Sequence, residues 1–252
     1  MLMSLLTEAA RSRGVRSFVL RAGRVTQAQQ RALSLLWPKY GIEFSPQPAD
    51  LDSIFGRRAP RGLEIGFGNG ENLATLAEAH PDRDYLGIEV HRPGVGRLLL
   101  AADASGLSNV RVLCHDAVEV LERQLPSHSL DSVMILFPDP WPKKRHNKRR
   151  LIQPAFVELV ADRLKPGGIL RLATDWAPYA AQMLEVLSAC PAFENLSATA
   201  TQVEPGGDRI ATRFEKRGRR LGHGVWDFAF KSKTAAQTVH HELHGQRSEH
   251  HS

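Results

Sequence analysis

Acidic side chains follow two consecutive apolar segments of this chain, close to a third acid within a glycine-rich loop. The loop, residues 64–70, reads Glu-Ile-Gly-Phe-Gly-Asn-Gly and comes directly after Leu63. Glu89 ends the next apolar segment, and Asp116 follows the one after that. Glycines at such a place allow a tight turn and let a ligand approach the backbone closely. The pattern indicates a ligand site lined by carboxylates, although each acid alone could be a surface carboxylate at a strand end.

The glycine-rich loop does not match two common phosphate-binding patterns. A dinucleotide fingerprint reads G-x-G-x-x-G, but Gly70 comes one residue early and Glu71 occupies the third glycine position. No Gly-Lys-Ser/Thr follows, so a P-loop is absent as well. Glu64 stands two residues before Gly66, where it would repel a pyrophosphate. The loop therefore favours a cationic ligand, with Glu89 placed to accept from ribose hydroxyls and Asp116 from an adenine amino group.

A proline-rich loop after another apolar segment leads directly into a strongly basic run. Residues 137–142 read Phe-Pro-Asp-Pro-Trp-Pro, and residues 143–150 contain six Lys and Arg and no acid. The charge of that run, +6, equals the net charge of the whole chain. Residues 1–40 and 209–220 are also basic. Trp141 could stack on a base, and the cations could bind phosphates. The alternatives are a rigid turn with a core tryptophan and solvated charged patches.

Short apolar runs alternate with helical stretches from Leu63 onward, which is typical of a mostly parallel sheet with helices on both faces. We predict strands over 62–65, 85–90, 110–114, 131–137, 168–173 and 225–230, and helices over 27–36, 69–79, 94–105, 117–125, 154–164 and 179–189. Ligands of such sheets bind beyond the carboxyl ends of the strands. This architecture would bring the acids, the glycines and the proline-rich loop to one edge.

Composition sets broad limits on the class of protein. The chain has 252 residues, 42% of them hydrophobic, which suffices for a core and excludes a collagen-like or disordered chain. Cys114 and Cys190 stand alone with no zinc-like spacing, so we expect no metal and a reducing compartment. No apolar run is long enough for a signal peptide or a membrane span. We expect a cytoplasmic protein without a membrane partner or an obligate protein partner, and therefore a monomer.

The glycine loop and the acids resemble those of Rossmann-like methyltransferases that use S-adenosylmethionine. The E-x-G-x-G-x-G loop of that class is matched by Glu64, Gly66, Gly68 and Gly70, and its strand-end acids by Glu89 and Asp116. The resemblance implies S-adenosylmethionine as cofactor, with the loop around its methionine part, Glu89 at the ribose and Asp116 at the adenine. Its sulfonium and ammonium groups would explain the local acidity.

Within that class, the sequence resembles the bacterial tRNA (guanine-N7-)-methyltransferases. The matching segments are 138–146 with 148–150, 87–91, 173–175 and 212–218, and Arg16-Ser17-Phe18 resembles the N-terminal stretch of that family. The resemblance implies transfer of a methyl group to the guanine at position 46 in the variable loop of tRNA. It implies that Glu64, Glu89, Asp116 and Asp139 line the cofactor site and that Asp139 is catalytic. It assigns substrate contacts to Lys143, Asp175, Thr212, Arg213, Phe214 and Glu215, and RNA contacts to Arg145, His146, Asn147, Lys148, Arg149 and Arg150.

Periodicity and composition along the chain suggest how it is organised. We expect a basic N-terminal extension over residues 1–60, a methyltransferase domain over 61–232 and a disordered, His-rich tail over 233–252. Outside the three basic zones the charges sum to −11, so the basic zones would surround an acidic middle.

The chemistry of guanine N7 limits what catalysis requires. N7 carries a lone pair and no proton, so its attack on a methyl group needs no general base, and alignment and electrostatics should dominate. Methylation makes the ring cationic, so a carboxylate that accepts from N1–H and the exocyclic amine binds more tightly as charge develops. Asp139 or Asp175 could play this role. The rival readings are an adenine-N6 methyltransferase, because Asp139-Pro140-Trp141 resembles the D-P-P-[YW] loop of those enzymes, and a non-catalytic RNA-binding protein.

Overall fold

The computed structural model describes residues 17–18, 25–196 and 224–233. Within these residues the strands are β1 (Arg61–Ile65), β2 (Asp84–Ile88), β3 (Val110–Leu113), β4 (Leu130–Leu136), β5 (Leu164–Thr174), β6 (Phe193–Asn195) and β7 (Trp226–Ser232). The α-helices are α1 (Gln27–Leu35), α2 (Trp37–Tyr40), α3 (Leu51–Phe55), α4 (Glu71–Ala79), α5 (Arg92–Ala104), α6 (Ala117–Glu119), α7 (Pro154–Arg163) and α8 (Ala177–Ala189). A π-helical turn, η1 (Val120–Gln124), continues α6, and a 3-10 helix, η2 (Lys144–Arg149), forms in the basic run.

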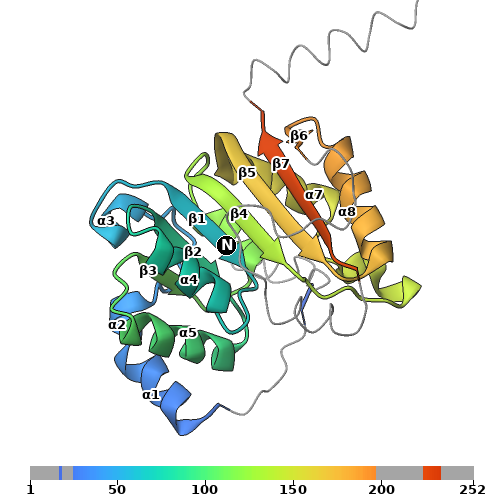
Figure 1. Cartoon of the computed structure of the whole chain (residues 1–252). Helices are drawn as coiled ribbons and strands as arrows, with labels where there is room; N and C mark the ends of the chain where they lie inside the picture. Colours follow the sequence, from blue (N-terminus) through green and yellow to red (C-terminus); the bar gives the residue numbers. More distant parts are fainter. Residues whose placement is uncertain (1–16, 19–24, 197–223, 234–252) are drawn as a thin grey trace, which may run out of the picture.

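The strands form one sheet in the order β3-β2-β1-β4-β5-β7-β6 (Figure 1). The first five are parallel, whereas β7 runs antiparallel to both β5 and β6. The strand order reverses between β1 and β4, and in open α/β sheets this switch point is where ligands bind. The predicted α/β fold with a mostly parallel sheet is confirmed.

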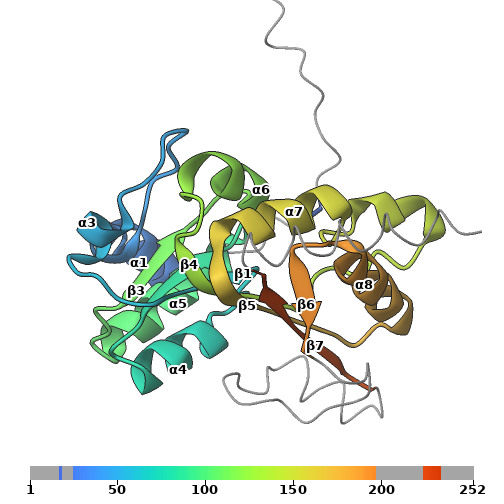
Figure 2. The ribbon, with the colours of Figure 1, turned by 90° about the horizontal axis from the view of Figure 1, so that it is seen from above.

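Alternate residues of the central strands pack into two hydrophobic layers. Leu63 and Ile65 of β1 belong to the layer with α6, α7 and α8, whereas Met134 and Leu136 of β4 belong to the layer with α4 and α5. Figure 2 shows α7 and α4 on opposite sides of the sheet. Strands that are apolar on both faces are expected where helices cover both sides of a parallel sheet. Glu64 of β1 departs from this pattern, because it is a buried acid between two core residues.

Residues 25–60 contribute to both layers. Ala32 of α1 and Tyr40 of α2 are buried in the layer with α5, and Leu51 of α3 is buried in the other. The Ile42 amide donates to the Val112 carbonyl at 2.8 Å, so this segment also pairs with the outer edge of β3. Covering an edge strand removes a row of unpaired backbone groups. This part of the basic zone over residues 1–40 therefore helps to build the core as well as adding charge.

The sequence-based elements agree with the structure except where elements are short. Each predicted strand and helix overlaps an observed one, but α2, α3 and β6 were missed. They have four, five and three residues, too few for a hydrophobic period to be visible. Pro38 lies in the first turn of α2, a position that tolerates proline because the backbone N–H there has no partner within the helix. A second short helix therefore follows α1 directly. No described helix is long and apolar enough to cross a membrane.

Candidate active site

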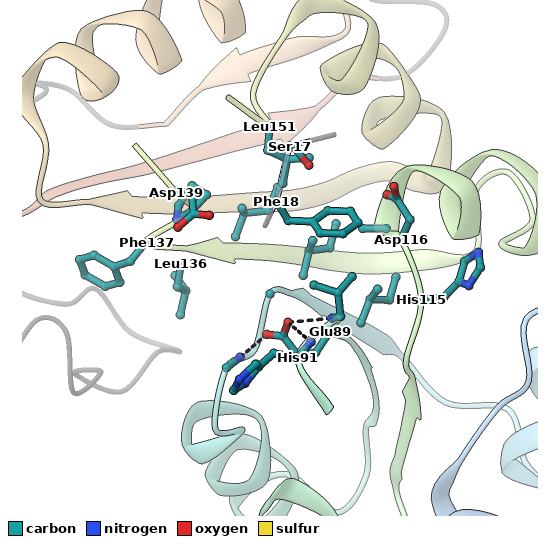
Figure 3. A pocket seen from close by; sticks show the side chains of 18 residues that line it. Ser17, Phe18, Glu89, His91, His115, Asp116, Leu136, Phe137, Asp139 and Leu151 are labelled. Atoms are coloured by element: carbon teal, nitrogen blue, oxygen red, sulfur yellow. Dashed lines mark hydrogen bonds between the residues drawn. The ribbon is translucent and has the colours of Figure 1, made fainter. Parts of the chain in front are cut away.

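A cavity of about 390 Å³ lies at the carboxyl ends of β1, β2, β3 and β4 (Figure 3). This volume falls within the usual range of small-molecule sites, about 300–1,000 Å³. The cavity lies beside the switch point between β1 and β4. Its lining residues are Ser17, Phe18, Ile65, Gly66, Gly68, Ile88, Glu89, Val90, His91, His115, Asp116, Ala117, Ile135, Leu136, Phe137, Pro138, Asp139 and Leu151.

The glycine-rich loop after β1 is held by close backbone contacts. Gly66, Gly68 and Gly70 all have positive φ, which glycine adopts at little cost. A Cβ on Gly94, in the first turn of α5, would lie 2.0 Å from the Gly68 carbonyl oxygen. No sequence pattern marks Gly94 as part of the site. Because Gly94 has no side chain, α5 can pack closely against the glycine-rich loop. This packing holds the loop in place as one wall of the cavity.

Glu89 ties the ends of β1 and β2 together. Its Oε2 accepts from the Gly68 amide at 2.8 Å, and its Oε1 accepts from the Val90 and His91 amides at 2.7 and 2.9 Å (Figure 3). These three bonds use most of the roughly four acceptor positions of a carboxylate. Glu89 therefore orders the loop, and a bound ribose would share this carboxylate with the backbone.

Glu64 lies behind the glycine loop and does not line the cavity. Its Oε2 accepts from Asn72 Nδ2 of α4 at 3.0 Å. Burial is the main cause that raises the pKa of Glu64 from its ordinary value to about 7; the Asn72 hydrogen bond acts against this shift, and the nearby Glu89 carboxylate adds to it. A cation bound in the cavity would reverse part of this shift, because it favours the ionised carboxylate.

Asp116 and His115 line the cavity at the end of β3 (Figure 3). Asp116 caps α6, since its Oδ1 accepts from the Val118 amide at 2.9 Å. Among the described residues, none donates a hydrogen bond to its second oxygen, which leaves an acceptor at this end of the cavity. His115 stacks on Phe44, with ring centroids 3.8 Å apart. A residue from the segment before β1 thus supports this wall.

The proline-rich loop after β4 carries the exposed Asp139 at the other end of the cavity. Phe137 and Trp141, on either side of Asp139, have φ of 53° and 43°. Non-glycine residues rarely adopt such angles, at a cost on the order of 1–3 kcal/mol each. This loop therefore needs contacts that hold it in place.

Two such contacts reach the loop from Ser17 and Phe18. Trp141 Nε1 donates to the Ser17 carbonyl at 3.0 Å, and the Arg149 guanidinium donates to the Phe18 carbonyl at 3.5 Å while lying 3.9 Å from the Trp141 ring centroid. Phe18 points into the cavity from the side opposite Glu89 (Figure 3). The predicted stacking tryptophan is thus half-buried and covered by Arg149 on one face in this structure.

The basic run differs strongly in exposure along its length. The side chains of Lys143, Lys144, Arg145 and Lys148 are exposed, those of His146, Asn147 and Arg149 are half-buried, and Arg150 is 4% exposed. Burial, followed by the charges of Arg145, Arg149 and Lys143, lowers the pKa of His146, which therefore favours the neutral imidazole. The exposed positive charge of η2 and its flank is therefore carried mainly by the lysines and Arg145.

The predicted site residues fall into three groups. Gly66, Gly68, Glu89, Asp116 and Asp139 line one cavity, whereas Glu64, Gly70, Lys143 and Asp175 lie outside its lining. Thr212, Arg213, Phe214 and Glu215 lie outside the described residues. The lining residues that sequence reasoning did not assign include Ser17, Phe18, His91, His115 and Leu151. For Ser17 and Phe18, the family-like stretch at residues 16–18 was the available signal.

Solved structures share this fold at low sequence identity. The 16S rRNA methyltransferase KamB matches with a TM-score of 0.55 and 16% identity, covering 75% of this chain and 95% of that one. The antibiotic-resistance methyltransferase Kmr matches with a TM-score of 0.52 and 16% identity, covering 77% and 95%. The chain therefore has the fold of the Rossmann-like methyltransferases, with its cavity at the switch point of the sheet.

Sequence relatives identify the family. A family model described as "Putative methyltransferase" matches residues 58–228. The tRNA (guanine-N(7)-)-methyltransferase of Alkalilimnicola ehrlichii is 58% identical over 227 residues, 89% of this chain and 95% of that protein. The protein of the same name from Sodalis glossinidius is 56% identical over 218 residues, 86% and 91%. The chain belongs to the tRNA (guanine-N(7)-)-methyltransferase family.

Proposed function

We propose that this protein transfers a methyl group from S-adenosylmethionine to N7 of guanine 46 in the variable loop of tRNA. One observation carries the proposal: the cavity lined by Glu89, Asp116 and Asp139 borders a loop that leads, four residues beyond Asp139, into a row of exposed cations. A nucleoside-sized acidic cavity and a phosphate-binding surface are therefore continuous. The names of the relatives support the same substrate and the same atom.

The residues around the cavity fit S-adenosylmethionine, which supplies an electrophilic methyl group when bound. Gly66 and Gly68 leave room for a ligand, since no atom lies within 4 Å of a Cβ built on either. The raised pKa of Glu64 reflects a buried carboxylate to which no described residue brings a positive charge, and a cofactor with a sulfonium and an ammonium group would bring one into the adjoining cavity. Ile65, Ile88 and Ile135 provide apolar walls, and Asp116 an acceptor for the adenine end.

The protein's own residues then act by alignment and electrostatics. Because guanine N7 carries no proton, no side chain has to remove one during the attack. Asp139 lies at the mouth of the cavity, where its carboxylate can accept from the guanine edge as the ring becomes cationic. Asp175 follows β5, the strand next to β4, and therefore lies at the same edge of the sheet. We assign Asp139 the catalytic role and Asp175 a substrate contact.

RNA would lie across the exposed face of the basic run. Lys143, Lys144, Arg145 and Lys148 present their charges to solvent, and each phosphate contact adds to affinity through release of counterions. The proposal assigns phosphate binding to these four residues, with Lys143 nearest to Asp139 in the chain. Residues 212–215 complete the proposed substrate contacts.

The test is transfer of a labelled methyl group to total tRNA, followed by mass analysis of the nucleosides and mapping of the modified position. We expect N7-methylguanosine at position 46, and no label on a tRNA variant in which that guanine is replaced. Label on N6-methyladenosine would favour the rival enzyme class. If calorimetry detected no binding of S-adenosylmethionine, the protein would be an RNA-binding member of the fold and the proposal would be wrong.

A further inference from the structure

We propose that Arg150 is a positioning residue that holds the Asp139 loop against α8, and that it does not bind RNA phosphates. The inference rests on the proposed function, because it takes Asp139 as the catalytic residue. Family resemblance groups Arg150 with the RNA-binding residues 145–149, but its surroundings differ from theirs. Its side chain is 4% exposed, whereas Arg145 and Lys148 are exposed.

The guanidinium of Arg150 is occupied by partners inside the protein. Its Nε donates to the Pro140 carbonyl at 2.8 Å, and one terminal nitrogen donates to Gln182 Oε1 at 2.6 Å and to the Pro178 carbonyl at 3.5 Å. The guanidinium carbon lies 4.9 Å from the centre of the buried Tyr179 ring. A phosphate could reach this group only if the loop and α8 separated.

These contacts join two parts of the proposed site. Pro140 follows Asp139 directly, while Pro178, Tyr179 and Gln182 belong to α8, which begins two residues after Asp175. Arg150 therefore links the loop of one carboxylate to the helix that follows the other. The spacing of Asp139 and Asp175, which both face the same guanine in the proposed function, depends on this bridge.

The backbone of the Asp139 loop explains why a bridge is needed. Phe137 and Trp141 adopt positive φ, and such conformations persist only where surrounding contacts over-determine them. Prolines 138, 140 and 142 have no N–H, so the loop has few donors of its own with which to form local hydrogen bonds. The Pro140 carbonyl is the point at which Arg150 supplies the missing restraint.

The bridge is itself anchored. Tyr179 Oη accepts from the Ile152 amide at 3.1 Å, and Gln182 Nε2 donates to the Ile152 carbonyl at 3.1 Å. Two of the partners of Arg150 on α8, Tyr179 and Gln182, are thus fixed to the chain just beyond Arg150. A planar guanidinium can bond Pro140 and Gln182 at once in a fixed geometry, which a lysine ammonium cannot reproduce.

The test compares Arg150→Met and Arg150→Lys with the exposed control Arg145→Gln. We expect Arg150→Met to lower kcat for methyl transfer at saturating tRNA by about 10- to 100-fold, because small misplacements of a catalytic group have effects of this size. The salt dependence of tRNA binding should stay as in the parent. Arg145→Gln should instead raise KM for tRNA and lower the salt slope by about one unit.

Arg150→Lys separates the two roles. A phosphate contact needs mainly the charge, so lysine would restore both affinity and turnover; a positioning role needs the planar fork, so kcat should stay well below that of the parent. The proposal is overturned if Arg150→Met lowers the salt slope as the control does, or if it keeps kcat within about twofold of the parent.

Hydrogen exchange gives a readout that does not need activity. Without tRNA, peptides spanning 137–149 and 175–182 should exchange faster in Arg150→Met than in the parent, and unchanged exchange in both would contradict the bridge. If the parent transfers no methyl group to tRNA, the proposed function fails. Hydrogen exchange would still show whether Arg150 holds the Asp139 loop against α8. If Arg150→Met does not fold, Gln182→Met is the alternative variant, because it removes the side-chain acceptor of Arg150 on α8. It should also lower kcat and speed exchange in these peptides, but by less than Arg150→Met.

Discussion

The two loops that face each other across the cavity are built in opposite ways. The loop after β1 uses glycines for its positive φ and is fixed by nearby backbone, through Glu89 and the close approach of Gly94. The loop after β4 places Phe137 and Trp141 at positive φ and is held by side chains: Trp141 reaches the Ser17 carbonyl, 124 positions away, and Arg150 links the Pro140 carbonyl to α8. The wall that would hold the methyl donor is thus built from glycines packed closely against α5 and the end of β2, whereas the wall that would meet the RNA depends on side chains that reach Ser17 and α8.

The largest effect should come from the RNA-facing wall. Asp139→Asn keeps the size of the side chain but removes the charge that would stabilise the cationic guanine, so we expect turnover to fall by about 100-fold or more. Single-turnover methyl transfer to tRNA measures this. Asp103→Asn, a half-exposed acid of α5 paired with Lys39, is the matched control and should keep full turnover. Full turnover in both Asp139→Asn and Asp175→Asn, with unchanged cofactor affinity, would remove the carboxylate from the mechanism.

In the wall that would hold the methyl donor, Glu64→Gln should change how the stability of the protein depends on pH. The folded protein raises the pKa of Glu64 from 4.5 to about 7, so between these values it binds more protons than the unfolded chain. Stability without cofactor should therefore fall as pH rises through this range and be lowest above it. Glutamine keeps an acceptor for Asn72 and does not titrate, so the variant should be more stable than the parent at about pH 8, by on the order of 3 kcal/mol.

Urea unfolding at about pH 5 and about pH 8 measures this difference, which should be small at the lower pH. Equal stability of the two proteins at both pH values would show that Glu64 is not strained by burial. A second expectation follows for binding: a cationic cofactor favours the ionised carboxylate, so its binding near neutral pH should release protons in the parent but not in Glu64→Gln.

The contrast between the loops also explains what the sequence could predict. Residues 64–70, Glu89 and Asp116 are recognisable because a local pattern produces a local structure. The burial of Arg150 is not recognisable, because its neighbours in sequence are exposed and its partners Pro178 and Gln182 lie far along the chain. The contact of Ser17 with Trp141 spans 124 positions and has no periodic signal. Counting charges therefore overestimates how many cations of residues 143–150 are exposed, since four of the six Lys and Arg are exposed in the structure.

Gly94→Ala tests whether the wall that would hold the methyl donor is already formed before the cofactor binds. The added methyl group would collide with the Gly68 carbonyl and push the glycine loop toward the cavity. We expect the Kd of S-adenosylmethionine, measured by calorimetry, to rise by about tenfold, equivalent to roughly 1.4 kcal/mol. Gly106→Ala is the control, since its φ of 61° costs stability but nothing lies within 4 Å of the new Cβ. Equal cofactor affinity in Gly94→Ala and the parent would show that the loop adapts when ligand binds.

The smallest effect should come from a single exposed cation of the RNA-facing wall. Lys148→Ala removes one charge of η2, so tRNA affinity should fall by a few fold and the slope of log K against log salt by about 0.9. Arg83→Ala, at an exposed residue just before β2 and thus at the opposite edge of the sheet, should leave the slope unchanged. A fall in turnover at saturating tRNA without a change in slope would mean that Lys148 positions the loop as Arg150 does. The exposed and the buried cations would then share one role, and the basic run would be a scaffold for Asp139 along its whole length.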